Sequence, residues 1–103
     1  MAALKGSART YLRGLAHHLK PVAQLGKNGL TESFLEEVNQ ALDMHELIKL
    51  KFTSFKAEKK ALAKEIESQT RSELVGLIGN IAIFYREHHD QEKRKIHFPE
   101  GIR

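Results

Sequence analysis

The stretch from residue 22 to residue 38, VAQLGKNGLTESFLEEV, predicts a strand, a glycine-bounded loop and a capped helix in direct succession. Residues 22–25 form a short, mainly apolar run that favours a strand, and the loop Gly26–Gly29 follows it. Thr31 is a favourable N-cap residue, and Glu32 suits the positive end of a helix dipole. A strand that leads through a loop into a helix is typical of chains that alternate the two kinds of element.

The rest of the chain shows the same alternation of helical and extended patterns. The expected elements are a helix with an apolar stripe from Leu4 to Leu15 that ends before Pro21, a helix that ends near His45, a strand over residues 47–52, a helix over residues 56–70, and strands over residues 74–78 and 81–85. The order α-β-α-β-α-β-β predicts one compact α/β (α+β) domain. We expect its four-stranded mixed sheet to be packed with helices, to have parallel crossovers and to close with an antiparallel hairpin.

The composition excludes several classes of protein. The 103 residues suit one domain, and no apolar run approaches the ~20 residues of a membrane span, so we expect a cytoplasmic protein with no membrane partner. Because the chain has no cysteine, disulfides, thiolate zinc sites and cysteine nucleophiles are excluded. The histidine pairs at 17–18 and 88–89 lack further ligands at a suitable spacing, so we expect no metal site. No G-x-S-x-G motif is present, and we expect no enzyme, no cofactor and no small-molecule substrate.

Positive charge is concentrated at the start of the chain. No acidic residue precedes Glu32, so the net charge of +4 divides into +5 over residues 1–31 and −1 over the rest. A one-sided basic segment on a folded domain indicates a polyanionic partner, although a solvated basic face without a partner has the same pattern. The acid-free start could also be a transit peptide. Because it runs directly into the first helix and strand, we read it as mature protein.

The Gly26–Gly29 loop (GKNG) has the best chemical logic for binding an anion. Glycines let the backbone approach a ligand closely, and the N–H groups at the start of the following helix favour a group such as a nucleic-acid phosphate. Lys27 adds a positive charge, and Asn28 adds a donor and an acceptor. The same sequence also suits a plain tight turn, because a G-x-x-G pattern alone is weak. Neither the nucleotide-triphosphate loop nor the dinucleotide-binding motif is present.

Other side chains outside this loop are weaker candidates for contact with a nucleic acid. Lys49 and Lys51 alternate with apolar residues on an expected strand, and Arg86 ends the last apolar strand, but solvated charges explain all three equally well. Phe55 and Tyr85 could stack a base, although aromatic residues next to apolar strands also suit the core.

Several linked motifs make the chain similar to a known family. In chain order they are Leu12–His17 (LRGLAH), Leu19–Pro21 (LKP), Leu25–Thr31 (LGKNGLT), His45–Lys51 (HELIKLK), and Ile78-Gly79 through Phe84–Arg86 (FYR). They resemble the CRM domain family over residues 4–98, and in particular its stand-alone bacterial, YhbY-like members. The resemblance implies an RNA-binding domain with a four-stranded sheet, similar to the C-terminal domain of translation initiation factor three. In this family the GxxG loop is likened to that of KH domains and is thought to contact the RNA backbone.

The resemblance also implies which residues bind RNA and in what setting. The family's positions fall here on Gly26, Lys27, Asn28, Gly29 and Thr31, and on the basic residues Arg13, Lys20, Lys49, Lys51 and Arg86. The stand-alone bacterial members are associated with precursors of the large ribosomal subunit. We therefore expect a non-catalytic ribosome assembly factor that binds ribosomal RNA in the pre-large-subunit particle. The alternatives are a module that docks an acidic ribosomal partner and a small nucleotide-binding enzyme.

The same comparison sets the expected domain limits. We expect the CRM-like domain to span residues 1–98, with its core over residues 4–86. Residues 87–103 form a charged tail that we expect to be loosely attached, and the pattern allows a short edge strand at residues 96–98. One departure from the family pattern lies at Asn80, where a lysine is common, so the turn carries less positive charge.

Overall fold

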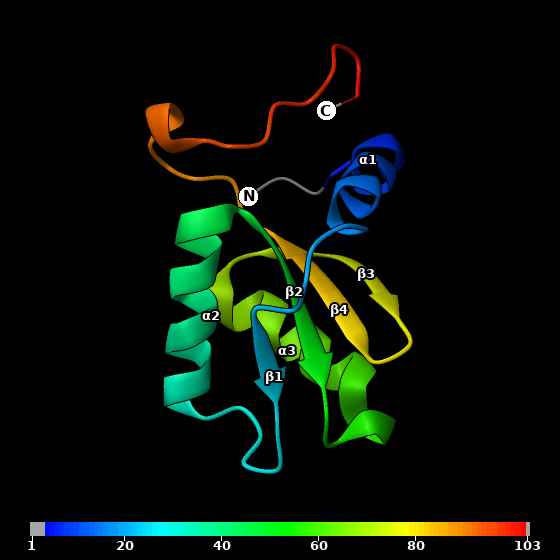
Figure 1. Ribbon diagram of the computed structural model, residues 1–103, viewed down its shortest axis with the longest axis vertical. Coiled ribbons are helices and arrows are strands. Elements are labelled where there is room, and N and C mark those ends of the chain that lie inside the picture. Colours follow the sequence, from blue (N-terminus) through cyan, green and yellow to red (C-terminus); the bar gives the residue numbers. More distant parts are fainter. Residues whose placement is uncertain (1–3, 103) are drawn as a thin grey trace.

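A four-stranded sheet forms the centre of the molecule in the computed structural model, which describes residues 4–102 (Figure 1). The helices are α1 (Gly6–Ala16), α2 (Glu32–His45) and α3 (Lys59–Thr70), and the strands are β1 (Ala23–Leu25), β2 (Leu47–Phe52), β3 (Glu73–Ile78) and β4 (Ile81–Tyr85). Short 3-10 turns lie at Lys56–Glu58 and Gln91–Lys93. The predicted order α-β-α-β-α-β-β is therefore confirmed. None of the helices within residues 4–102 is both long and apolar enough to span a membrane.

The strands lie in the order β1-β2-β4-β3. β1 runs parallel to β2, because the chain crosses between them through α2, whereas β4 is antiparallel to both β2 and β3. The β3–β4 hairpin turns at Gly79, whose φ of +58° suits glycine. The register between β3 and β4 shifts between Leu74 and Gly76, so β3 contains a bulge that the sequence pattern does not predict. Since β2 and β3 are both antiparallel to β4, they run in the same direction, and the chain makes a second parallel crossover between them through α3. The mixed sheet with parallel crossovers and a closing hairpin agrees with the expected architecture.

The alternation along β2 gives the sheet one fully covered face. Ile48, Leu50 and Phe52 are buried on the face that α2 and α3 cover. The helix residues in the same cluster are Phe34, Val38, Leu42, Ala63 and Ile66. Since complete burial of a large apolar side chain contributes about 1.5–3 kcal/mol, this cluster fixes both helices to the sheet.

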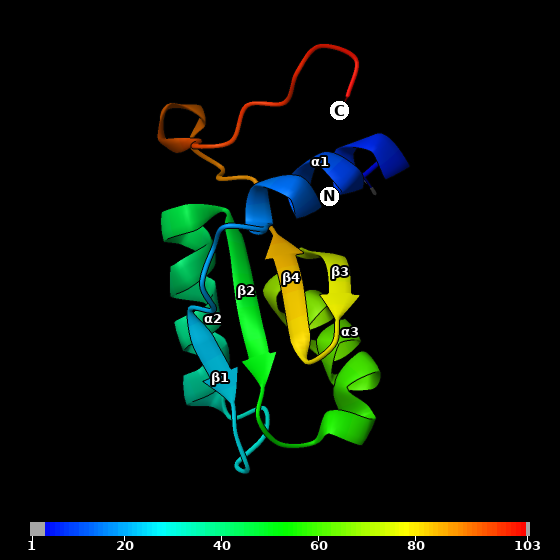
Figure 2. The same cartoon turned by 45° about the vertical axis from the view of Figure 1, so that its right-hand side comes forward.

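The opposite face of the sheet is only partly covered. α1 crosses the end of this face where β2 begins and β4 ends (Figure 2), and Leu12 and Ala16 pack there with Leu47 and Tyr85. Farther along the strands, a cross-strand row on the same face consists of Gln24, Lys51, Ile81 and Ile78. Gln24 and Lys51 are exposed, and Ile78 is 64% exposed. This row of four residues is called the open sheet face below.

Residues 87–102 pack against the domain, so the expected loose attachment of the tail is wrong. The buried Glu46 carboxylate accepts hydrogen bonds from the backbone N–H groups of His88, Lys95 and Ile96, at 2.7, 2.7 and 2.9 Å. The short edge strand allowed at residues 96–98 does not form. The physical reason is that the Ile96 N–H group bonds this carboxylate instead of a neighbouring strand.

Candidate nucleic-acid interface

The Gly26–Gly29 loop forms a tight turn between β1 and α2, at the end of the molecule opposite α1 (Figure 2). Gly29 N–H donates to the Gly26 carbonyl at 3.0 Å, and Gly29 has a φ of +70° that suits glycine. Thr31 caps α2, since its side-chain oxygen accepts a hydrogen bond from Phe34 N–H at 3.0 Å. The side chains of Lys27 and Asn28 are exposed at the tip. The five predicted residues of the loop and helix start therefore lie together.

The segment that follows β2 supports this loop. Thr53 and Ser54 donate backbone hydrogen bonds of 3.1 and 3.3 Å to the carbonyl of Leu25, the last residue of β1. A β-carbon on Gly29 would lie 3.7 Å from Cε2 of Phe55. The loop therefore rests on a neighbouring connection that is itself fixed by hydrogen bonds.

A shallow polar groove lies beside the loop and contains one carboxylate. It is lined by Gln24, Gly26, Lys27, Asn28, Gly29, Thr31, Ser33, Phe34 and Glu37. Lys27 would attract a phosphate in this groove, whereas the exposed Glu37 side chain would repel it. Glu37 is not among the residues that the sequence predicted for the site, although its position about one and a half helical turns beyond Thr31 places it near the start of α2.

Lys51 and Lys49 share one face of β2 but differ in their contacts. Lys51 lies opposite Gln24 on β1 and Ile81 on β4, is exposed, and has no ion-pair partner within residues 4–102. Lys49 instead donates from Nζ to the Leu19 carbonyl at 3.0 Å, and so ties β2 to the segment after α1. Lys51 is therefore the freer of the two charges, and it lies in the row next to the loop.

Arg13 lies where α1 meets the open sheet face. Its aliphatic stem crosses Gly76, where a β-carbon would come within 3.0 Å of Arg13 Cδ. Its guanidinium donates to the Val75 carbonyl at 3.0 Å and to the Thr10 hydroxyl at 3.1 Å. A small groove is lined by Arg13, His17, Lys49, Ile78, Ile81 and Ile83. Arg13 and Lys49 thus border the open sheet face from the α1 side.

Arg86 is fully engaged inside the domain. Its guanidinium donates to the side chain and carbonyl of Asn39 at 2.7 and 3.0 Å, to the Thr70 carbonyl at 2.6 Å and to Asp43 at 3.0 Å. These contacts tie α2 to the end of α3, and the Arg86 side chain is 20% exposed. The structure does not bring Arg86 together with the loop or with Lys51, so its proposed contact with RNA stays a prediction.

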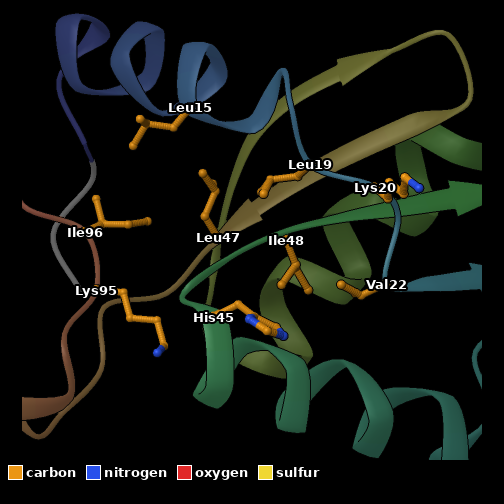
Figure 3. Close-up of a pocket in the computed structure, with 9 residues that line it drawn as sticks. All are labelled: Leu15, Leu19, Lys20, Val22, His45, Leu47, Ile48, Lys95 and Ile96. Carbon is orange, nitrogen blue, oxygen red and sulfur yellow. The ribbon is translucent and has the colours of Figure 1, made fainter.

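Lys20 also lies apart from the loop, on an apolar groove between α1, β2 and the C-terminal segment (Figure 3). The groove has a volume of about 380 Å³ and is lined by Leu15, Leu19, Lys20, Val22, His45, Leu47, Ile48, Lys95 and Ile96. Three of its apolar side chains, Leu15, Leu19 and Val22, are each about 40% exposed. The predicted site residues therefore divide among the loop, the open sheet face, this groove and the helix-covered side.

The two aromatic candidates for base stacking differ in exposure. Tyr85 is 1% exposed and belongs to the core beneath α1, so it offers no ring face to a base. Phe55 is 41% exposed and lies beside the loop. The turn at Asn80 receives Lys59, whose Nζ donates to Asn80 Oδ1 at 3.3 Å and to the Gly79 carbonyl at 2.6 Å. Positive charge is thus present at this turn from another element.

No group of three or more potential metal ligands occurs within residues 4–102.

Residues 4–86 match the model of the CRS1 / YhbY (CRM) domain. A Haemophilus influenzae protein named "RNA-binding protein" is 43% identical over 100 residues, which cover 96% of this chain and 98% of the relative. A Bacillus subtilis protein named "Probable RNA-binding protein YqeI" is 34% identical over 97 residues, which cover 93% of this chain and 99% of the relative. The solution structure of a Staphylococcus aureus protein, described as a candidate RNA-binding protein, superposes with a TM-score of 0.76 at 36% identity, covering 91% of this chain and 99% of that one.

Proposed function

Because the chain belongs to the CRS1 / YhbY (CRM) domain family, we propose that it is a non-catalytic protein that binds the phosphate backbone of RNA. The observation that carries this proposal is that the exposed side chains of Lys27 and Asn28 on the loop lie near those of Gln24 and Lys51 on the open sheet face. Lys51 pairs in register with Gln24, two residues before Gly26, so the strand charge and the loop are neighbours. The names of the Haemophilus influenzae and Bacillus subtilis relatives support RNA as the partner.

In this proposal the loop and the lysines have separate tasks. The glycines allow an RNA backbone to approach the start of α2, where the helix dipole favours negative charge. Lys27 and Lys51 neutralise phosphates on either side of that contact, and Arg13 and Lys49 extend the basic surface toward α1. Binding of this kind depends on charge and shape, and it positions the RNA without selecting a sequence.

We further propose that the RNA is ribosomal and that the protein assists assembly of the large-subunit precursor in the cytoplasm. The resemblance to the stand-alone bacterial members supports this setting.

A second candidate function is docking of an acidic ribosomal protein. The apolar groove of Figure 3 favours it, since exposed Leu15, Leu19 and Val22 lie there with Lys20 and Lys95. An apolar floor with basic side chains suits a peptide that combines apolar and acidic residues. Direct binding to naked RNA separates the two functions, because protein docking does not require it.

The experiment compares binding of naked large-subunit ribosomal RNA by the native protein, Gly29→Asp and Gly101→Asp at several salt concentrations. Both glycines have positive φ, +70° and +83°, so the two variants share the charge change and the backbone strain. Gly101 belongs to residues 87–102, the C-terminal segment, which lies at the end of the molecule opposite the loop (Figure 1).

We expect Gly29→Asp to weaken binding by at least about tenfold, because placing like charges together at an interface costs several kcal/mol. Gly101→Asp should bind as the native protein does. Equal binding by all three proteins would mean that the loop is a structural turn that does not contact the RNA. If the native protein does not bind RNA at physiological salt, docking of an acidic protein becomes the favoured function. Circular dichroism of each variant shows whether it is folded.

A further inference from the structure

Phe55 is an exposed aromatic residue in a conformation that bulky side chains rarely adopt. Its ring is 41% exposed, whereas the other phenylalanine and tyrosine side chains within residues 4–102 are buried or half-buried. Its backbone has φ +55° and ψ +37°, in the left-handed region. Non-glycine residues occupy this region infrequently, and such strain persists only where the surroundings hold it.

The surroundings that hold Phe55 are the hydrogen bonds on both sides of it. Before Phe55, the N–H groups of Thr53 and Ser54 both donate to the Leu25 carbonyl. After it, the N–H group of Glu58 donates to the Phe55 carbonyl at 3.0 Å. Phe55 belongs to neither of the two core clusters, so burial does not explain where the ring lies.

The ring lies beside the Gly26–Gly29 loop. A β-carbon on Gly29 would lie 3.7 Å from Cε2 and 3.9 Å from Cζ, so a side chain at this position would touch the far edge of the ring. Phe55 thus offers an exposed apolar surface beside the loop, whose tip carries the exposed side chains of Lys27 and Asn28. An aromatic surface beside a phosphate contact is the combination with which proteins bind single-stranded nucleic acid.

We propose that Phe55 is a stacking platform for one unpaired nucleobase, next to the phosphate held by the Gly26–Gly29 loop. This inference rests on the proposed binding of RNA and names the class of RNA: a single-stranded or bulged segment. In a continuous duplex, each base is stacked between its neighbours and offers no free face to an aromatic ring. The loop then positions the backbone, and Phe55 favours RNA whose bases are unstacked.

The test compares the native protein with Phe55→Leu on a complete RNA strand and on abasic versions of that strand, and it uses Phe55→Trp as a rescue variant. Phe55→Leu keeps an apolar side chain without a ring, and its affinity is measured for a ten-nucleotide single strand and for the same strand with a stable abasic residue at each position in turn. We expect Phe55→Leu to bind the complete strand about 5- to 150-fold more weakly, the range measured for loss of one stacked base. At one position, the abasic strand should bind both proteins equally, and Phe55→Trp should restore binding of the complete strand.

Each other outcome has a definite meaning. If Phe55→Leu binds the complete strand as tightly as the native protein, stacking is refuted while the proposed function stands. If Phe55→Leu weakens the complete and all abasic strands equally, the ring only positions the loop, and the stacking inference is wrong. If the native protein binds large-subunit ribosomal RNA but neither strand, this inference is wrong while the proposed function stands, and if it binds none of these RNAs, both fail. Thermal unfolding of Phe55→Leu and Phe55→Trp confirms that the compared proteins are folded.

Discussion

Replacing Glu46 by glutamine should detach the C-terminal segment from the domain. The buried Glu46 carboxylate has its Oε1 atom bonded by the N–H groups of Lys95 and Ile96, and its Oε2 atom bonded by the N–H group of His88. All three donors lie in the segment after β4, between 42 and 50 residues from Glu46. A glutamine retains one acceptor oxygen, but its NH₂ group replaces the other oxygen. This NH₂ group would then face a backbone N–H group, and two donors cannot form a hydrogen bond.

The magnitude follows from these three hydrogen bonds. A hydrogen bond to a charged group contributes about 1.5–3 kcal/mol, and leaving a buried donor without a partner costs about 1–3 kcal/mol. Glu46→Gln loses the charge and at least one of the three bonds, so docking of the segment should weaken by about 2–4 kcal/mol. Glu46→Ala loses all three bonds and should weaken it further. The backbone groups of Glu46, which bond Leu42 and Arg86, are unchanged in both variants.

Amide hydrogen exchange measures this effect directly. With a factor of ten for every 1.4 kcal/mol, the amides of His88, Lys95 and Ile96 should exchange about 30- to 700-fold faster in Glu46→Gln, while amides in β2 keep their protection. Glu36→Gln, an exposed change on α2, the helix that ends directly before Glu46, serves as the control and should change none of them. Unaltered exchange of the three amides in Glu46→Gln would refute the carboxylate as the anchor of the segment.

Three further predictions concern the charges. Lys51→Ala should reduce the slope of log K against log salt for ribosomal RNA by about 0.7–0.9, the value for one phosphate contact, whereas Lys64→Ala on the outer side of α3 should not change it; equal slopes would place the RNA on another face. Glu37→Gln should tighten RNA binding by about two- to fivefold at low salt, because it removes a like charge from the groove beside the loop, and unchanged affinity would mean that RNA does not enter this groove. Arg86→Lys should lower the free energy of unfolding by about 2–4 kcal/mol in thermal or urea unfolding, since an ammonium cannot reproduce its four contacts. The folded Arg86→Lys variant should keep the RNA affinity of the native protein. A loss of affinity would mean that Arg86 does contact the RNA.

Local patterns predicted the elements well because each depends on neighbouring residues. The alternation over residues 47–52 gives β2 with its buried Ile48, Leu50 and Phe52, and Thr31 caps α2 as its chemistry indicates. Where the structure differs from a predicted element boundary, the difference is only a few residues. Residues 56–58 form a 3-10 turn before α3 begins at Lys59, instead of the first turn of that helix.

The features that the sequence did not reveal depend on partners distant in the chain. Nothing near Glu46 indicates that its carboxylate binds a segment more than 40 residues later, so the tail was expected to be loosely attached. The contacts of Arg86 with Asn39 and Asp43 span 47 and 43 residues. The bulge in β3 is likewise a property of its pairing with β4.

The contacts of the basic residues also rank their contributions to binding, which charge alone cannot do. Lys27 and Lys51 are exposed and have no ion-pair partner within residues 4–102, so they can meet a phosphate without giving up an internal bond. Arg13 donates to the Val75 carbonyl on β3, and Lys49 donates to the Leu19 carbonyl after α1. A phosphate can therefore bond only the N–H groups of these side chains that are left over. Arg86 makes four contacts inside the domain and would have to break some of them. The salt slope should therefore respond most to loss of Lys27 or Lys51, and least to loss of Arg86, although all are equally positive.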